Sequence, residues 1–276
     1  MKVTLISHWC FNILKKIGLF LLIVFSIVYP IFSDALERNS GWRDLPFVEN
    51  AFSDVVLESE FSSGLTPALK WENPIKVWVK HDVGNEELHN HLLSLHLQQL
   101  RKLTGLSITK VSKRYEANML IFFTKQALWK DIVRREMGEK SAENTYGSTC
   151  MFNIRSERST SRIVQAVIVI PVDQAREQGK LVSCIVEETT QALGLKNDSD
   201  RSFPSVFNDH TPDIFLTPLD ITLVKLLYSP EVKAGMNKTT LKPILIRRYK
   251  EMQRNGELDE IYSQSIYSPL RQYLGM

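Results

Sequence analysis

The sequence predicts an α+β domain in which helices back a mixed, twisted sheet, followed by a mostly helical C-terminal part. Between residues 75 and 193, segments with strand and helix periodicity follow one another in the order β-α-β-β-α-β-β-α. After residue 216 the apolar residues recur only at helical spacing. A hydrophobic content of 43% and a charged content of 24% are ordinary for a globular protein. We therefore expect one domain over residues 74–276, preceded by an irregular leader at 36–73 that holds one short helix near 52–61.

Five segments show strand patterns. Residues 75–80 alternate three apolar residues with Lys, Trp and Lys, which is typical of a strand with one solvated face. Residues 119–124 form an unbroken apolar run, which predicts a strand that is buried on both faces. The remaining strands are expected at residues 107–111, 149–154 and 163–170.

Helices are predicted where apolar residues recur every three or four positions. The first covers residues 86–103 and is closed by Gly105, and a shorter one covers 125–137. A third helix, at about 181–193, carries the candidate site. In the C-terminal part the helix signals are Thr217 as N-cap, Pro218 as first helical residue, Asp220 in the first turn, and Asn255-Gly256 as a helix end.

The first 35 residues have the composition of a secretory signal. Lysines precede an uncharged apolar run of about 16 residues at 17–32, and Ser33-Asp34-Ala35 provides small residues for cleavage. The run is shorter than the ~20 residues that span a bilayer, so we expect a signal peptide, with an uncleaved N-terminal membrane anchor as the alternative. Either reading places the domain in the periplasm or anchored facing it, with the membrane contacted only through residues 1–35.

Charge and cysteine content narrow the function classes further. The formal net charge of +3 is small, and no run of Lys and Arg is interleaved with aromatic residues, which argues against a nucleic-acid partner. After removal of residues 1–35, Cys150 and Cys184 are the remaining cysteines of an exported chain. Because thiols oxidise in that compartment, we expect a disulfide between them.

Residues 184–198, CIVEETTQALGLKND, carry the candidate site. On a helix, Glu187, Glu188 and Gln191 lie opposite the apolar residues, with Glu187 and Gln191 one turn apart. Gly194 then permits a positive φ and a sharp turn, and Asn197 follows where a third polar group could converge on the first two. The alternative interpretation is that both glutamates form the solvated face of an amphipathic helix.

The arrangement E-E-x-x-Q-x-x-G-x-x-N resembles the H-E-x-x-H-x-x-G-x-x-H signature of the metzincin zinc peptidases. Residues 205–208, SVFN, resemble the Met-turn of that fold, with Phe207 at the methionine position, and residues 216–228 resemble its last helix. The resemblance covers residues 74–229 and implies a metzincin-like (zincin-like) domain with a helical C-terminal extension. It also implies structural-turn roles for Gly194 and Phe207.

The same resemblance places Glu188 at the position of the general base and assigns metal-ligand positions to Glu187, Gln191 and Asn197. Additional candidate ligands are Asp198, His210 and, if unpaired, the Cys184 thiolate. Histidines are missing from all three ligand positions. Carboxylate and amide oxygens suit a hard ion such as calcium better than they suit zinc.

The sequence is more closely similar to domain-of-unknown-function family 2927, a family of exported proteobacterial proteins. The shared segments are Glu187–Asp198, Ser205–Asp209 and Leu216–Tyr228. This resemblance implies a fold and a compartment and names no activity.

Two functions follow from these residues. The first is a non-catalytic binding or interaction module of the cell envelope, a pseudopeptidase that binds a peptide, protein or glycan and needs no cofactor. The second is a peptidase-like hydrolase that uses a divalent metal ion at the Glu187, Gln191 and Asn197 positions and Glu188 as general base. They differ in whether an ion or an activated water is required, so the sequence leaves open whether the protein is an enzyme.

Overall fold

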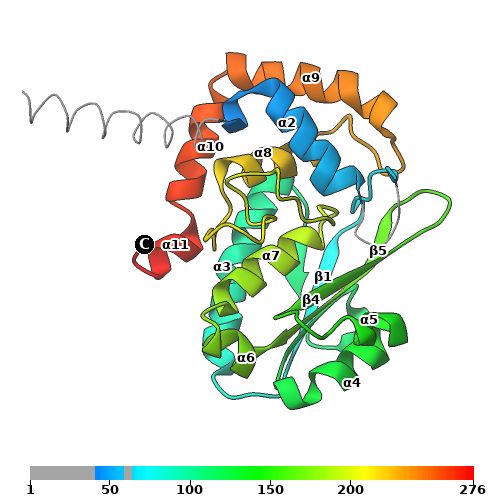
Figure 1. The fold of residues 1–276 in the computed structure, drawn as a ribbon, viewed down its shortest axis with the longest axis vertical. Coiled ribbons are helices and arrows are strands. Elements are labelled where there is room, and N and C mark those ends of the chain that lie inside the picture. Colours follow the sequence, from blue (N-terminus) through cyan, green and yellow to red (C-terminus); the bar gives the residue numbers. More distant parts are fainter. Residues whose placement is uncertain (1–40, 59–63) are drawn as a thin grey trace, which may run out of the picture. The chain divides into compact units, whose positions relative to one another are not determined.

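The described residues of the computed structural model, 41–58 and 64–276, contain a five-stranded mixed sheet with the strand order β2-β1-β3-β5-β4 (Figure 1). The strands are β1 (Ile75–His81), β2 (Ile108–Lys110), β3 (Met119–Thr124), β4 (Met151–Ser156) and β5 (Ile163–Pro171). Pairing is parallel except between β4 and β5, which run antiparallel. The predicted α+β class and strand order along the chain are therefore confirmed, whereas the signal peptide or anchor predicted at 1–35 lies outside the described residues.

Helices surround this sheet and make up the C-terminal part (Figure 1). They are α2 (Leu45–Phe52), α3 (Glu86–Thr104), α4 (Gln126–Met137), α5 (Glu139–Glu143), α6 (Val172–Glu177), α7 (Leu181–Gln191), α8 (Pro218–Leu227), α9 (Lys238–Arg254), α10 (Glu257–Ile266) and α11 (Pro269–Tyr273). Shorter helical turns are η1 (Gly41–Arg43), the π-helical η2 (Ser53–Leu57) and η3 (Arg114–Glu116). Within the described part of the chain, no helix is both long and apolar enough to cross a membrane.

Alternate side chains of the central strand β3 pack on opposite faces of the sheet. Ile121 and Phe123 join the larger core together with α3 and α7, while Leu120 and Phe122 join a smaller core with α4 and α5. All six residues of β3 are buried, as predicted from its unbroken apolar run. The sheet is thus a middle layer with helices on both faces.

The described residues before β1 contribute to the core through α2, η2 and Trp71, in contrast to the irregular leader predicted at 36–73. Helix α2 and η2 take the place of the single helix predicted near 52–61, and Trp42, Phe52 and Trp71 are buried. Helix α2 packs on α8 and α9, which lie far away in the sequence. Local periodicity over so few residues is a weak signal, and the long-range packing decides the structure.

The C-terminal part is helical, as predicted. Thr217 and Asp220 form a reciprocal capping box at the start of α8, with Pro218 as the first helical residue. Helix α9 ends at Arg254, the amide of the C-cap residue Asn255 closes the last turn, and Gly256 follows with a positive φ.

Helix α3 packs on α7 through a buried histidine, His96. Its Nε2 lies 3.1 Å from Thr190 Oγ1, and the Thr190 hydroxyl itself donates to the Val186 carbonyl at 2.6 Å. The Thr190 oxygen is left to accept, so a neutral His96 carries its proton on Nε2. Burial is the main reason why the pKa of His96 falls to about 4.

We predict that His96 makes the domain less stable in acid. Its folded-state pKa lies below the value of about 6.5 in the unfolded chain, so the unfolded state binds the proton first. The free energy of unfolding therefore falls as the pH drops from 6.5 towards 4, by about 2 kcal/mol at pH 5 from this group. Urea unfolding at pH 7.5 and 5.0 measures the loss, and His96→Gln should remove this part of it.

The matched control is His91 on the same helix, which is exposed. His91→Gln should retain the wild-type pH dependence. If His96→Gln lost as much stability as the wild type between the two pH values, the buried neutral imidazole would be the wrong explanation.

Candidate functional site

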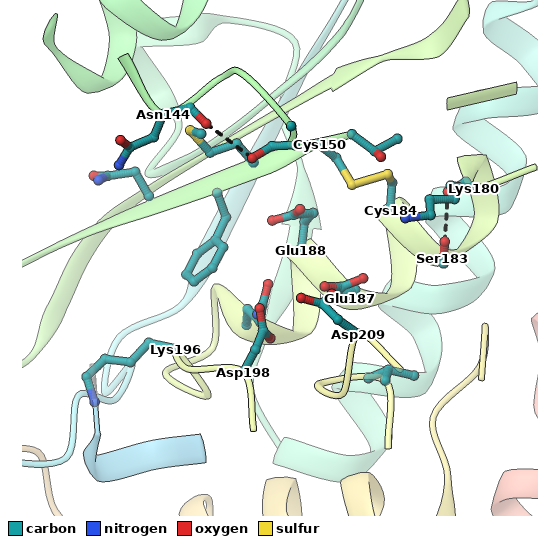
Figure 2. Close-up of a pocket in the computed structure, with 18 of the residues that line it drawn as sticks. Asn144, Cys150, Lys180, Ser183, Cys184, Glu187, Glu188, Lys196, Asp198 and Asp209 are labelled. Atoms are coloured by element: carbon teal, nitrogen blue, oxygen red, sulfur yellow. Dashed lines mark hydrogen bonds between the residues drawn. A yellow bond between two sulfur atoms is a disulfide. The ribbon is translucent and has the colours of Figure 1, made fainter. Parts of the chain in front are cut away.

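Helix α7 packs with one face and lines a cleft with the other. Ile185, Val186 and Thr189 are fully buried, whereas Glu187 and Glu188 line the cleft (Figure 2). This division is the one that helical periodicity predicts. The side chain of Glu188 is only 4% exposed, so Glu188 does not belong to a solvated helix face, which was the alternative interpretation.

The cleft has a volume of about 1390 Å³ and lies between α7 and the edge strand β4. Four stretches of chain contribute most of its lining: β4 with the preceding turn and α5, the residues from 179 to 191, the loop after α7, and residues 206–214. Among the described residues that line it are six carboxylates and three lysines, a formal charge of −3 in a chain whose total is +3. The cleft is thus acidic although the chain is basic, which favours a cationic ligand.

A disulfide joins α7 to the start of β4. Cys150 and Cys184 are bonded, with Cα atoms 5.9 Å apart, which confirms the predicted pairing (Figure 2). Closing a loop with a sequence separation of 34 stabilises the fold by about 3–4 kcal/mol, mainly by restricting the unfolded chain. The bond also corrects one expectation, because a paired Cys184 has no thiolate to offer a metal ion.

Three carboxylates converge in the cleft. Glu187, Asp198 and Asp209 each place one oxygen within 4.8 Å of the others, and Figure 2 shows them close together, on α7 and on two loops. Gln191 lies next to this group, since its Nε2 donates to Asp198 Oδ1 at 2.7 Å. Oxygen atoms at this spacing are suited to a hard divalent cation or to a cationic side chain.

Two of the predicted ligand residues are directed elsewhere. Asn197 is buried, and its Nδ2 donates to the backbone oxygens of Asp54 at 3.0 Å and Asp198 at 2.8 Å, which ties the loop to η2. His210 is exposed and lies 3.3 Å from Asp200, outside the carboxylate group. The structure therefore brings Glu187 and Asp198 together but joins neither Asn197 nor His210 to them.

Asp209 completes the carboxylate group, although no ligand role was assigned to it from the sequence. It is exposed and follows directly on the turn at 205–208. A signal was present in the segment Ser205–Asp209, which ends in an acidic residue. Only the folding of this turn towards α7 brings that residue to Glu187.

A buried carboxylate, Asp220, holds the turn that carries Asp209. Its Oδ1 accepts from the Ser205 hydroxyl at 2.6 Å, and its Oδ2 accepts from the amides of Val206 at 3.1 Å and Thr217 at 2.8 Å. Burial raises the pKa of Asp220 to about 6, and these hydrogen bonds oppose that rise. Phe207, at the centre of the turn, is fully buried in the core.

The chain reverses sharply after α7 at Gly194. This residue has a φ of +114°, and a Cβ added to it would lie 2.1 Å from the carbonyl oxygen of Leu69. The last carbonyls of the helix end are satisfied nearby: Trp71 Nε1 donates to Ala192 at 2.8 Å, and the Tyr228 hydroxyl donates to Leu193 at 2.7 Å. Glycine is required here both for its conformation and for the close approach of two backbones.

Lys196 is a half-buried cation in the wall of the cleft. Its Nζ donates to the carbonyl oxygen of Val56 in η2, and burial lowers its pKa to about 8. The side chain stem lines the cleft while the ammonium anchors the loop. Burial also raises the pKa of Asp213, another residue of the lining, above its usual value.

The chain belongs to the family described as Protein of unknown function (DUF2927), which matches residues 46–247. The match begins in α2 and ends in α9, so it includes the sheet, α7, the turn at 205–208 and α8. No curated protein matches the chain.

We predict that Gly194→Ala destabilises the domain by roughly 3 kcal/mol or more, because the new methyl group collides with the Leu69 carbonyl and the positive φ disfavours alanine. Urea unfolding of the oxidised protein measures the change. Gly256→Ala is the matched control: Gly256 also has a positive φ, of +79°, but nothing lies within 4 Å of its added Cβ. The control should lose only about 1 kcal/mol, and equal losses in the two variants would show that the contact with Leu69 is unimportant.

Proposed function

We propose that the protein is an exported binding module of the cell envelope that holds an extended peptide in the cleft between β4 and α7. The observation that carries the proposal is the position of β4. It is an edge strand of the sheet, and Met151, Phe152, Asn153 and Ile154 line the cleft. No strand of the described residues pairs with the other side of β4.

An edge strand that lines a cleft is suited to peptide binding. Along its free side, every second residue presents an unpaired backbone N–H and C=O, and an extended peptide can add to them as a further strand. The backbone hydrogen bonds supply affinity, and pockets for alternate side chains supply specificity. Because β4 is only six residues long, a segment of about five or six residues fits it.

The charge of the cleft indicates which side chains such a peptide carries. Glu187, Asp198 and Asp209 each place one carboxylate oxygen within 4.8 Å of the others in this cleft, and the whole lining has a formal charge of −3. A lysine or arginine side chain directed from β4 towards α7 would meet this group. We therefore infer a preference for basic peptides.

The metzincin resemblance supports a peptide ligand and a loss of catalysis. The order of α7, the glycine turn at Gly194, the turn around Phe207 and the closing helix α8 is the order expected of a metzincin-like domain. The positions of the zinc histidines hold Glu187, Gln191 and Asn197 instead. A peptidase scaffold without its zinc ligands keeps a peptide-shaped cleft and lacks the activated water.

The test uses hexapeptides of alanine and serine, labelled with fluorescein, that carry one arginine at each position in turn. Fluorescence polarisation with the exported, disulfide-bonded protein should show position-dependent binding. N-methylation of the amides that face β4 should weaken binding at least tenfold, because it removes backbone hydrogen bonds. Glu187→Gln and Asp209→Asn should each lower the affinity for the arginine peptides by about tenfold, which corresponds to the loss of one charge-assisted contact.

Glu260→Gln on α10 is the control, since Glu260 is exposed and does not line the cleft. It should bind the peptides as the wild type does. If no peptide bound, or if N-methylation had no effect at any position, strand addition at β4 would be ruled out.

A second function, a metal-dependent hydrolase, is favoured by one observation. The oxygens of Glu187, Asp198 and Asp209 form a set that fits a hard ion such as calcium or manganese and does not fit zinc, which prefers nitrogen and sulfur ligands. A bound ion would lower the pKa of a coordinated water. Glu188, nearly buried beside this set, would act as the general base that takes the proton of that water.

Metal analysis tests this second function directly. The protein is purified without chelator, equilibrated with zinc, manganese and calcium, and analysed by mass spectrometry of the metals. The hydrolase function requires one ion per chain that is lost in Glu187→Ala and kept in Glu188→Gln, with peptide hydrolysis lost in both variants. Absence of any ion from the wild type would end the hydrolase proposal and leave peptide binding untouched.

A further inference from the structure

Tyr146 is a large aromatic residue that lines the cleft and yet is 98% exposed. It lies in the turn between α5 and β4, three residues after Glu143, which is also exposed and also lines the cleft. Burying such a ring against a ligand would remove a large apolar area from water. The ring of Tyr146 is therefore available to contact a ligand at the rim of the cleft.

The turn that carries Tyr146 is held along its length. Two hydrogen bonds lie within it: Thr145 Oγ1 donates to the Ala142 carbonyl at 2.8 Å, and Ser148 Oγ donates to the Asn144 carbonyl at 3.2 Å (Figure 2). Two more join it to the region of α6: Gln174 Nε2 donates to the Ser148 carbonyl at 3.3 Å, and Thr149 Oγ1 donates to Gln178 Oε1 at 2.7 Å. The disulfide at Cys150 fixes its end. A turn that is already ordered loses little further entropy when a ligand binds to it. This favours a role of Tyr146 in binding.

We propose that Tyr146 is a specificity-determining residue that stacks on an arginine side chain of the peptide bound along β4. The inference rests on the peptide-binding function proposed above and deepens it. The face of a tyrosine ring attracts a cation, and a planar guanidinium also stacks on it. Glu143, the last residue of α5, adds a negative charge just before the turn. Tyr146 precedes the first residue of β4, Met151, by five positions, so a peptide on β4 passes the turn at one end.

The experiment compares an arginine hexapeptide with its citrulline counterpart, which keeps the planar shape and lacks the charge. Binding of both fluorescein-labelled peptides is measured with the wild type, Tyr146→Ala and Tyr146→Phe. Tyr146→Ala should lower the affinity for the arginine peptide by roughly threefold to thirtyfold, and the affinity for the citrulline peptide by less than about twofold. Tyr146→Phe keeps the ring and should bind as the wild type does.

Tyr115→Ala is the matched control, because Tyr115 is 78% exposed and lies away from the cleft. It should leave both affinities unchanged. If the wild type bound the arginine peptide and Tyr146→Ala bound it equally well, the role of Tyr146 would be overturned while peptide binding remained. Equal losses for arginine and citrulline would overturn the cationic contact, and a wild type that bound neither peptide would overturn both proposals.

Discussion

The cleft depends on how closely the chain can pass the Leu69 carbonyl after α7 ends. Gly194 makes this passage without a Cβ, and the chain then returns below the helix it has just left. The return brings Asp198 to Glu187 within one short loop. Leu69 lies before β1, so a residue of the N-terminal segment packs directly against the turn at Gly194 on which the site depends.

The second loop of the site is held by a buried charge. A carboxylate loses several kcal/mol when it leaves water, and hydrogen bonds offset this only in part, as the raised pKa of Asp220 shows. An apolar residue in its place would leave the Ser205 hydroxyl and the amides of Val206 and Thr217 without their acceptor. By accepting hydrogen bonds from Ser205, Val206 and Thr217, Asp220 fixes the position of the turn that leads to Asp209.

Local patterns in the sequence predicted most elements and one half of the site. Periodicity located the strands, the helices and the shared face of Glu187 and Glu188, because these depend on neighbours a few residues apart. Long-range contacts decided the rest. Asn197 turns away from the carboxylates because Asp54, 143 residues earlier in the sequence, accepts its amide through the backbone, and no local pattern encodes that pairing. Asp209 reaches the site only through the fold of its own turn.

Both proposed functions require a positive charge in the same place. Carboxylate oxygens within 4.8 Å of one another repel, and an ion or a guanidinium among them turns this repulsion into attraction. A calcium ion would need about six to eight oxygens, so Glu187, Asp198 and Asp209 would supply part of its shell. An ion alone, however, leaves a cleft of about 1390 Å³, an edge strand and the ring of Tyr146 without a role. A basic peptide uses all of them, so a peptide ligand, whether or not it is hydrolysed, accounts for more of the structure than an ion alone does.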